Sequence, residues 1–283
     1  MRFLFQFVAV VAISAAGGQA VTAVQDNPWL TLPVGLAAAV LATLVYRWVV
    51  GRTEKREVTE LAGRKAAGGL TRGVLIGFAM FAAVIVNLWF LGYVHVHVDG
   101  VGSVSGALGI LGFMTAAATT EELMFRGVLF RWVEKLTGTW IALLLTGLVF
   151  GASHLMNPDA TLWGAIAIAL SAGFMLAACY AATRNLWVTI GWHLGWNFAL
   201  GGVFSATVSG NGDSKGLLDT TLSSGPDLVT GGAFGVEGSL YTVGVGVVLT
   251  VFFLWLAARR GTIVPMRRSR RETAVTQPVP AAR

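Results

Sequence analysis

Charged residues and cysteine are both scarce in this sequence. Only 12% of its 283 residues are charged and 55% are hydrophobic, whereas a soluble domain carries about 25% charged residues. The single cysteine, Cys179, excludes an internal disulfide and a cysteine-based metal site. The sequence lacks the short, alternating apolar segments of a membrane barrel and contains apolar runs of about 20 residues instead. The sequence therefore predicts an all-α, polytopic membrane helical bundle.

Eight apolar runs predict about eight transmembrane helices. The runs cover residues 3–23, 29–50, 73–94, 104–135, 139–156, 161–183, 186–207 and 239–258. The first run ends in small residues and resembles a signal peptide, but we favour a first spanning helix. As a helix, the run from Val104 to Lys135 would be roughly 48 Å long. It must therefore tilt or project from a hydrocarbon core of about 30 Å.

The Lys and Arg residues fall almost entirely on one side of the predicted bilayer. With both termini inside, 19 of the 20 lie on or toward the cytoplasmic side, and only Lys215 lies outside. This asymmetry follows the positive-inside rule and predicts a multi-pass cell-membrane protein with cytoplasmic termini. It also accounts for the net charge of +6 without nucleic acid as a partner.

Three regions are expected along the chain. Residues 1–72 hold two spans and a basic cytoplasmic linker, residues 73–258 form the membrane core, and residues 259–283 form a basic, disordered tail. A catalytic bundle would occupy about residues 104–207 of that core. The Gly- and Ser-rich segment 208–237 predicts a flexible external loop, with an ordinary loop favoured over a cover for the site.

Few ionisable residues remain at membrane depth once the spans are placed. They are Glu121, Glu122 and Arg126 in the fourth span, His154 in the fifth and His193 in the seventh, with Asn197 one turn after His193. Measured from the cytoplasmic helix ends, Glu121, His154 and Asn197 lie roughly 21, 25 and 20 Å deep. A charge at the bilayer centre costs about 2.5–3.5 kcal/mol. Polar groups that three helices bring to one level therefore predict a shared intramembrane site.

The spacing of these residues suggests different roles. Glu122 and Arg126 are four residues apart and can pair along one helix face. Glu121 points about 100° away from Glu122 and is the candidate chemical carboxylate. His193 and Asn197 share a face in the same way. A purely structural salt bridge would explain Glu122 and Arg126 alone, but it requires neither the second carboxylate nor the other polar residues.

Several other intramembrane chemistries lack their residues. There is no His-Glu-x-x-His zinc motif, and no Gly-x-Ser-x-Gly nucleophile motif lies within a predicted span. Ser153 precedes His154 directly, but adjacent helical residues do not face each other. No aspartate lies within a predicted span, which excludes an aspartyl dyad.

The ordered set Glu121-Glu122-x-x-x-Arg126, Phe150-x-x-x-His154 and His193-x-x-x-Asn197 resembles one family. It is similar to the CAAX-protease and bacteriocin-processing (CPBP, or Abi) family of intramembrane proteases, which includes the Rce1-type prenyl-protein endopeptidases. The match covers about residues 119–198. The resemblance implies peptide-bond hydrolysis within the membrane, typically on the cytoplasmic side of lipidated C-terminal cysteines. It also implies that both glutamates and both histidines are catalytic, in either a metalloprotease or a glutamate-dependent hydrolase.

We therefore expect an intramembrane endopeptidase that acts on peptide or membrane-protein substrates in the lipid bilayer. Its expected catalytic residues are Glu121, Glu122, Arg126, His154, His193 and Asn197. Glu121 and His154 would activate a water, while His193 and Asn197 would donate hydrogen bonds to the oxyanion. In the metal version, Glu121, His154 and His193 would hold zinc. The metal-free version is slightly favoured.

Two other functions and one weaker motif stay open at this point. The chain could be a non-catalytic immunity or adaptor protein on the same fold, or a proton-coupled transporter, which the lack of an internal repeat disfavours. His95-x-His97-x-Asp99 places alternate side chains on one side of an extended segment and could bind a metal. An external connecting loop is the favoured interpretation of that motif.

Overall fold

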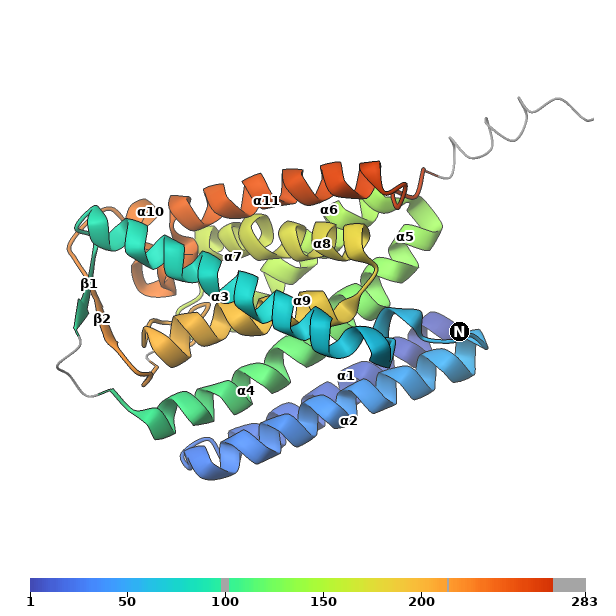
Figure 1. Cartoon of the computed structure of the whole chain (residues 1–283), viewed down its shortest axis with the longest axis horizontal. Helices are drawn as coiled ribbons and strands as arrows, with labels where there is room; N and C mark the ends of the chain where they lie inside the picture. Colours follow the sequence, from blue (N-terminus) through green and yellow to red (C-terminus); the bar gives the residue numbers. More distant parts are fainter. Residues whose placement is uncertain (98–101, 213, 267–283) are drawn as a thin grey trace, which may run out of the picture.

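The computed structural model describes residues 1–97, 102–212 and 214–266. Within these residues the chain is a bundle of helices with one two-stranded sheet (Figure 1). The helices are α1 (Arg2–Thr22), α2 (Pro28–Glu54), α3 (Ala66–Phe90), α4 (Val104–Glu122), α5 (Arg131–Thr137), α6 (Thr139–Ser153), α7 (Leu162–Ile168), α8 (Phe174–Thr183), α9 (Leu186–Asn197), α10 (Asp227–Thr230) and α11 (Leu240–Arg259). The strands are β1 (Val94–His97) and β2 (Asp219–Leu222). The predicted all-α bundle is confirmed.

Three π-helical segments extend or join these helices. Leu123–Phe130 connects α4 to α5, Ala169–Gly173 connects α7 to α8, and Phe198–Val203 follows α9. The fourth predicted span is thus helical without interruption from Val104 to Thr137.

Six of the described helical segments are long and apolar enough to cross a membrane, which confirms a polytopic membrane protein. They are Arg2–Thr22, Pro28–Glu54, Gly63–Phe90, Thr139–Met156, Leu162–Thr183 and Leu240–Arg259. The predicted spans 104–135 and 186–207, which carry most of the polar residues, are not among them. The count of eight therefore stays a prediction.

The long helices lie side by side, and the start of α1 and the end of α11 lie at the same end of the bundle (Figure 1). Helix α2 packs against α1 and α4, α3 packs against α9, and α11 packs against α8. Glycine permits the closest of these approaches. A Cβ on Gly77 would overlap the Trp192 carbonyl, and one on Gly195 would overlap the Val74 carbonyl. These glycines press one face of α9 onto α3 and leave the opposite face for the site.

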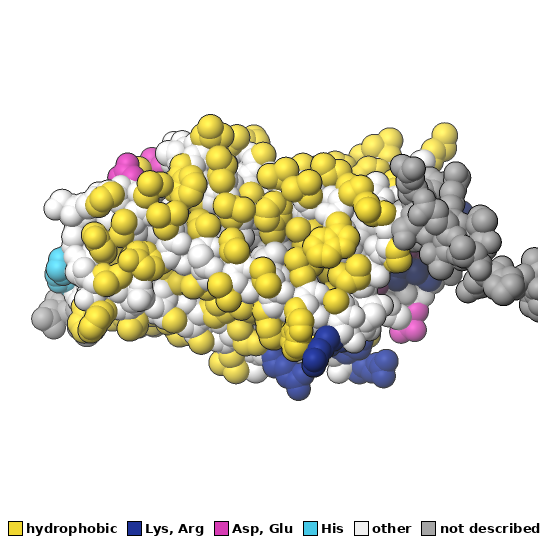
Figure 2. All heavy atoms as spheres, turned by 90° about the horizontal axis from the view of Figure 1, so that it is seen from above, with side chains coloured by type: hydrophobic (Ala, Val, Ile, Leu, Met, Phe, Trp, Pro, Cys, Tyr) yellow, Lys and Arg dark blue, Asp and Glu magenta, His cyan; other side chains and the backbone are white. Residues whose placement is uncertain are grey.

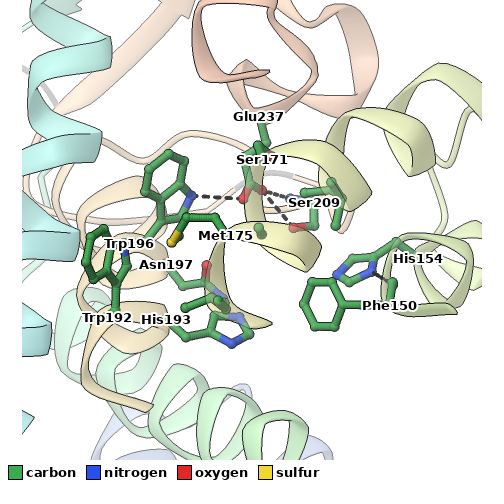
Figure 3. A pocket seen from close by; sticks show the side chains of 13 residues that line it. Phe150, His154, Ser171, Met175, Trp192, His193, Trp196, Asn197, Ser209 and Glu237 are labelled. Atoms are coloured by element: carbon green, nitrogen blue, oxygen red, sulfur yellow. Dashed lines mark hydrogen bonds between the residues drawn. The ribbon is translucent and has the colours of Figure 1, made fainter. Parts of the chain in front are cut away.

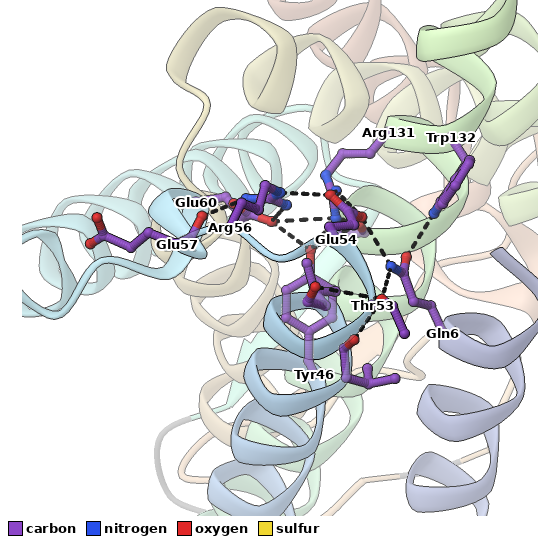
Figure 4. Close-up of polar contacts among 12 residues, drawn as sticks. Gln6, Tyr46, Thr53, Glu54, Arg56, Glu57, Glu60, Arg131 and Trp132 are labelled. Carbon is purple, nitrogen blue, oxygen red and sulfur yellow. Dashed lines mark hydrogen bonds and ion pairs between the residues drawn. The ribbon is translucent and has the colours of Figure 1, made fainter. Parts of the chain in front are cut away.

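The basic linker predicted over residues 51–72 is folded. Helix α2 runs on to Glu54, two 3₁₀ turns follow at Thr59–Leu61 and Gly63–Lys65, and α3 begins at Ala66 rather than Gly73. Ion pairs hold this segment to the fourth predicted span (Figure 4). Arg131 Nη2 lies 2.6 Å from Glu54 Oε1, and Arg131 Nη1 lies 3.3 Å from Glu60 Oε1. Within the segment, Arg56 Nη2 lies 2.7 Å from Glu60 Oε1.

The first apolar run is tied into the same network. The Gln6 side chain donates to Thr53 Oγ1 at 2.7 Å and to Glu54 Oε1 at 3.0 Å, and it accepts from Trp132 Nε1 at 2.7 Å (Figure 4). The first apolar run is therefore a helix that packs against the bundle through a buried glutamine with bonded side-chain atoms.

The opposite end of the bundle differs most from the sequence-based expectation. The segment predicted as a flexible loop contains β2, α10 and 3₁₀ turns at Gly232–Phe234 and Val236–Gly238. Strand β2 pairs antiparallel with β1, with His95 opposite Thr221 and His97 opposite Asp219. The connection that carries His95 and His97 is therefore partly a strand, while Asp99 lies outside the described residues. Turn-rich composition did not reveal this pairing because it depends on contacts across more than 100 residues.

The start of the predicted tail is also ordered. Thr139 N donates to the Val264 carbonyl at 3.0 Å, and Arg184 Nη2 donates to the Thr262 carbonyl at 2.6 Å. These bonds hold residues 260–266 against the start of α6 and the end of α8. The rest of the predicted disordered tail, residues 267–283, lies outside the described residues.

Candidate active site

A change of helix type follows Glu121 and Glu122 at the end of α4. The α-helix ends at Glu122 and a π-helix begins at Leu123. Such π-helical turns occur frequently at functional sites. Here Gly127 permits the turn to pack closely, because a Cβ at this position would lie 2.6 Å from the Tyr46 ring. The Gly127 carbonyl accepts from Arg131 Nη1 at 2.9 Å. We call the ion pairs among Glu54, Arg56, Glu60 and Arg131 the basic-end network. This network is thus bonded directly to the helix that carries the candidate site.

Glu122 and Arg126 form the predicted ion pair and are both buried. Arg126 Nη1 lies 2.7 Å from Glu122 Oε1, and the side chains are 2% and 0% exposed, respectively. The other guanidinium nitrogen, Nη2, donates to the Ala172 and Gly173 carbonyls at 3.2 and 3.0 Å. The guanidinium carbon also lies 4.5 Å from the centre of the Phe150 ring. Arg126 therefore ties the fourth span to the π-helix that joins α7 and α8.

Glu122 also orients His193. His193 Nδ1 lies 3.1 Å from Glu122 Oε1. A carboxylate only accepts hydrogen bonds, so Nδ1 carries the proton and Nε2 is turned toward the other glutamate. Nε2 lies 3.9 Å from Glu121 Oε2. The imidazole therefore stands between the two carboxylates.

Glu121 differs from Glu122 in its surroundings. Its side chain is 32% exposed and lines a cavity. Its Oε2 atom, however, is buried and has no hydrogen-bond partner among the described residues. A buried oxygen without a partner carries a free-energy cost of about 1–3 kcal/mol. This carboxylate is consequently available to a water or a substrate in the cavity.

His154 lies in the 3₁₀ turn His154–Met156, directly after the end of α6. Its Nδ1 lies 2.8 Å from the Phe150 carbonyl. A carbonyl only accepts, so Nδ1 carries the proton and Nε2 keeps its lone pair. The Phe150 ring centre lies 5.0 Å from the His154 ring and 6.0 Å from the His193 ring. The Phe150 ring thus packs against both histidine rings.

One cavity of about 250 Å³ brings these groups together. Four of the six predicted site residues line it, namely Glu121, His154, His193 and Asn197. His193 and Asn197 lie one turn apart on α9, whose N-terminus is capped by Asn185. Figure 3 shows His193, Asn197 and His154 around the adjoining smaller pocket. Glu122 and Arg126 do not line either pocket and stand behind His193 instead.

The three predicted metal ligands have suitable donor atoms, since zinc takes carboxylate oxygen and imidazole nitrogen. No group of three or more His, Cys, Asp or Glu side chains in the described parts of the chain is placed to hold a metal ion. Glu121, His154 and His193 line one cavity without converging on a common point. In this arrangement the three side chains do not fit a three-ligand zinc site.

Sequence reasoning missed a second buried carboxylate at the site. Glu237 is 3% exposed, and its Oε1 accepts from Trp196 Nε1 at 3.0 Å. Its Oε2 accepts from both the Ser209 amide and the Ser209 hydroxyl, each at 2.7 Å (Figure 3). Glu237 and Ser209 line the small pocket together with His154 and His193. A lone glutamate directly before the last apolar run was the available signal, but that residue was assigned to an ordinary loop.

Comparisons with known proteins agree with the motif residues. Residues 103–199 match the family model described as Type II CAAX prenyl endopeptidase Rce1-like. A Bacillus subtilis (strain 168) protein with the name "Putative membrane peptidase YdiL" is 27% identical over 209 residues, which are 68% of this chain and 81% of that protein. No solved structure matches the chain significantly. The resemblance that the motif residues carry is confirmed, and from residue 103 to residue 199 the chain matches the Rce1-like CAAX prenyl endopeptidase family.

Proposed function

We propose that this protein is an intramembrane endopeptidase that hydrolyses peptide bonds in membrane-associated, lipidated or peptide substrates. The family match and the similarity to a membrane peptidase support a peptidase in general. The observation that carries the proposal is the position of Glu121. Its buried, unpartnered Oε2 lies 3.9 Å from His193 in a cavity that His154 and Asn197 also line.

Glu121 and His154 activate the attacking water in this mechanism. One water hydrogen is directed to the Glu121 carboxylate and the other to the free Nε2 of His154. As the water oxygen bonds to the scissile carbonyl carbon, Glu121 accepts the proton. Glu121 then returns this proton to the leaving amine when the tetrahedral intermediate collapses. The step consumes one water and needs no other reactant.

Asn197 and His193 stabilise the oxyanion of that intermediate. The Asn197 side chain faces the cavity and has no hydrogen bond to a described residue, so its amide group can donate to a substrate oxygen. His193 donates from Nε2 when it is an imidazolium. With Arg126, a charged His193 balances the two carboxylates Glu121 and Glu122. Oriented donors of this kind lower the barrier to acyl transfer.

The purified protein, in detergent or reconstituted, tests this proposal. It is incubated with a panel of lipidated C-terminal peptides and small membrane-protein fragments, next to Glu121→Gln and His154→Ala variants. Glu57→Gln is the matched control, because Glu57 is an exposed carboxylate at the basic end of the bundle. We expect cleavage by the wild type and the control and a loss of at least about 100-fold in both site variants.

Two outcomes contradict the proposal. One is that the wild type cleaves no member of the panel under any metal condition. The other is that both site variants cleave as well as the control. A folded, inactive wild type would point to the non-catalytic adaptor function instead.

We also propose that both termini are cytoplasmic in a cell membrane. Figure 2 shows the Lys and Arg side chains in one half of the molecule, with mostly hydrophobic and uncharged side chains over the other half. The half with the Lys and Arg side chains holds the start of α1 and the end of α11 (Figure 1). Cytoplasmic loops carry an excess of Lys and Arg, so the basic end is assigned to the cytoplasm.

A further inference from the structure

A second and larger cavity, of about 510 Å³, adjoins the candidate site. Four residues line both this cavity and the one that contains Glu121: Phe113, Met114, Val208 and Asn211. The two spaces are therefore neighbours, and we call them together the groove. Along α4, the shared residues Phe113 and Met114 lie about two turns before Glu121, so the groove leads along this helix to the candidate catalytic carboxylate.

The walls of this groove have two different characters. Phe113, Met114, Ile110 and Val208 supply apolar surface. Polar groups come from the turn between α1 and α2, the start of α2 and the segment after α9, namely Gln25, Asp26, Thr31, Asn211, Ser214 and Lys215. Such a lining suits an extended peptide, whose backbone N–H and C=O groups need partners while alternate side chains point to opposite sides. A helical substrate would instead bond its backbone groups internally and would be about 10–12 Å across.

The groove lies at the end of the bundle opposite the basic residues. The lining residues of its larger cavity come from the α1–α2 turn, the start of α2, the first half of α4, and residues 208, 211, 212, 214 and 215. The cavity that contains Glu121 adds Ser153, His154 and Asn157, at and just beyond the end of α6. In Figure 1 these segments lie away from the end that holds the start of α1 and the end of α11. Lys215 is the one Lys or Arg among the described residues that line either space.

Packed side chains separate the candidate site from the basic end. Phe130, Tyr180, Leu186 and Ile190 are each no more than 2% exposed and belong to one buried core. The Phe130 and Tyr180 rings meet edge to face with their centres 5.7 Å apart. A peptide that approached Glu121 from the basic end would have to displace this core, whereas the groove already leads to Glu121 from the other end.

We infer that the substrate reaches Glu121 from the extracytoplasmic side, as an extended peptide segment bound in the groove between α4, the α1–α2 turn and the segment after α9. This inference rests on the proposed peptidase function and names the side and form in which the substrate arrives. It differs from cleavage on the cytoplasmic side, which the family resemblance by itself implied. The substrate class is accordingly the extracytoplasmic part of membrane-anchored or secreted polypeptides.

Single cysteines placed at the two ends of the bundle test the inference in the full-length protein. Native Cys179 is buried and is replaced by alanine. Gln25→Cys then places a thiol on the polar wall of the groove, where the Gln25 side chain is exposed. Glu57→Cys places the matched thiol at the exposed basic end. Intact cells are treated with a bulky, membrane-impermeant maleimide, and cleavage by each purified variant is measured before and after labelling.

We expect Gln25→Cys to be labelled in intact cells and Glu57→Cys to be labelled only after permeabilisation. Labelling should lower cleavage by Gln25→Cys at least about tenfold relative to the same variant before labelling, and it should leave Glu57→Cys unchanged. The reverse labelling pattern overturns the inference, as does full cleavage by labelled Gln25→Cys. If the unlabelled proteins cleave no panel member, the proposed function fails, while the labelling pattern still decides the orientation of the groove.

Discussion

His193 and Glu122 are joined by a hydrogen bond of 3.1 Å between Nδ1 and Oε1, and the same carboxylate oxygen accepts from Arg126 at 2.7 Å. Glu122 thereby fixes the direction of the imidazole while it lies outside the cavity itself. Glu121, its neighbour in the sequence, lines the cavity with an unpartnered oxygen. Adjacent glutamates thus have separable roles, one as a positioning residue and the other as the proposed base.

Substitution of the two glutamates should separate stability from activity. Glu122→Gln leaves the buried Arg126 guanidinium without its counter-charge, which costs about 3–5 kcal/mol when a buried pair is broken. Glu121→Gln removes a carboxylate that has no ion pair to Arg126 and should change stability by less than about 1 kcal/mol. Unfolding of both variants in one detergent, with activity measured in parallel, checks this. Equal destabilisation by the two substitutions would contradict the assignment.

The Asn197 amide should act in the transition state rather than in substrate binding. Asn197→Ala removes the proposed oxyanion donor, and loss of one such donor typically lowers kcat about 10²–10³-fold. KM should change little, because the bond forms only as charge develops on the substrate oxygen. Asn87→Ala, on the exposed side of α3, is the control. A rise in KM with unchanged kcat would instead place Asn197 in ground-state binding.

Glu237 and Ser209 should behave as one unit that shapes the cavity wall. Glu237→Gln removes an acceptor for the Ser209 amide and hydroxyl, and an unsatisfied buried group costs about 1–3 kcal/mol. We expect reduced stability for this reason. We also expect a raised KM, because Asn211, two residues after Ser209, lines the groove. A double-mutant cycle with Ser209→Ala measures the coupling. Additive effects of the two substitutions would show that the bond contributes little to the wall.

Acid should weaken the basic-end network through Glu60. Burial alone would raise the pKa of the Glu60 carboxyl, but the hydrogen bonds from Arg56 and the charge of Arg131 outweigh it and lower the pKa below 4.5. A lowered folded-state pKa stabilises the protein above pH 4.5, and this contribution is lost as the pH falls through the folded-state value.

Melting temperature measured against pH checks this expectation. The wild type should lose more stability than Glu60→Gln as the pH falls below 4.5. Glu57→Gln removes an exposed carboxylate three residues away and should retain the wild-type slope. Parallel slopes for the wild type and Glu60→Gln would show that Glu60 does not contribute to acid unfolding.

Removal of metal should leave cleavage largely unchanged, because Glu121, His154 and His193 do not converge as a ligand set. The protein is dialysed against a strong chelator, its metal content is measured, and cleavage is assayed before and after zinc is restored. Activity that disappears on dialysis and returns with stoichiometric zinc would contradict the metal-free mechanism. It would also require the two histidines and Glu121 to move together in the active protein.

The sequence by itself determined the membrane class, the order of the helices and the polar residues of the candidate site. Apolar runs report burial in lipid directly, and the spacing of Glu122 and Arg126 is a property of one helix, so both predictions were local. The similar depths of Glu121, His154 and Asn197 followed from the helical rise alone. Even so, the sequence did not reveal the π-helix after Glu122, where Gly127 packs closely against the Tyr46 ring.

Only the tertiary structure decided how the two ends of the bundle are built. The linker that carries Glu60 and the segment that carries Glu237 have no helical or strand periodicity, so composition classified both as loops. Each is folded by bonds to distant partners, Glu60 to Arg131 at the start of α5 and Glu237 to Trp196 on α9. Such pairings depend on chain segments brought together by the whole fold. For the same reason, the groove that leads to Glu121 could not be predicted from any single stretch of sequence.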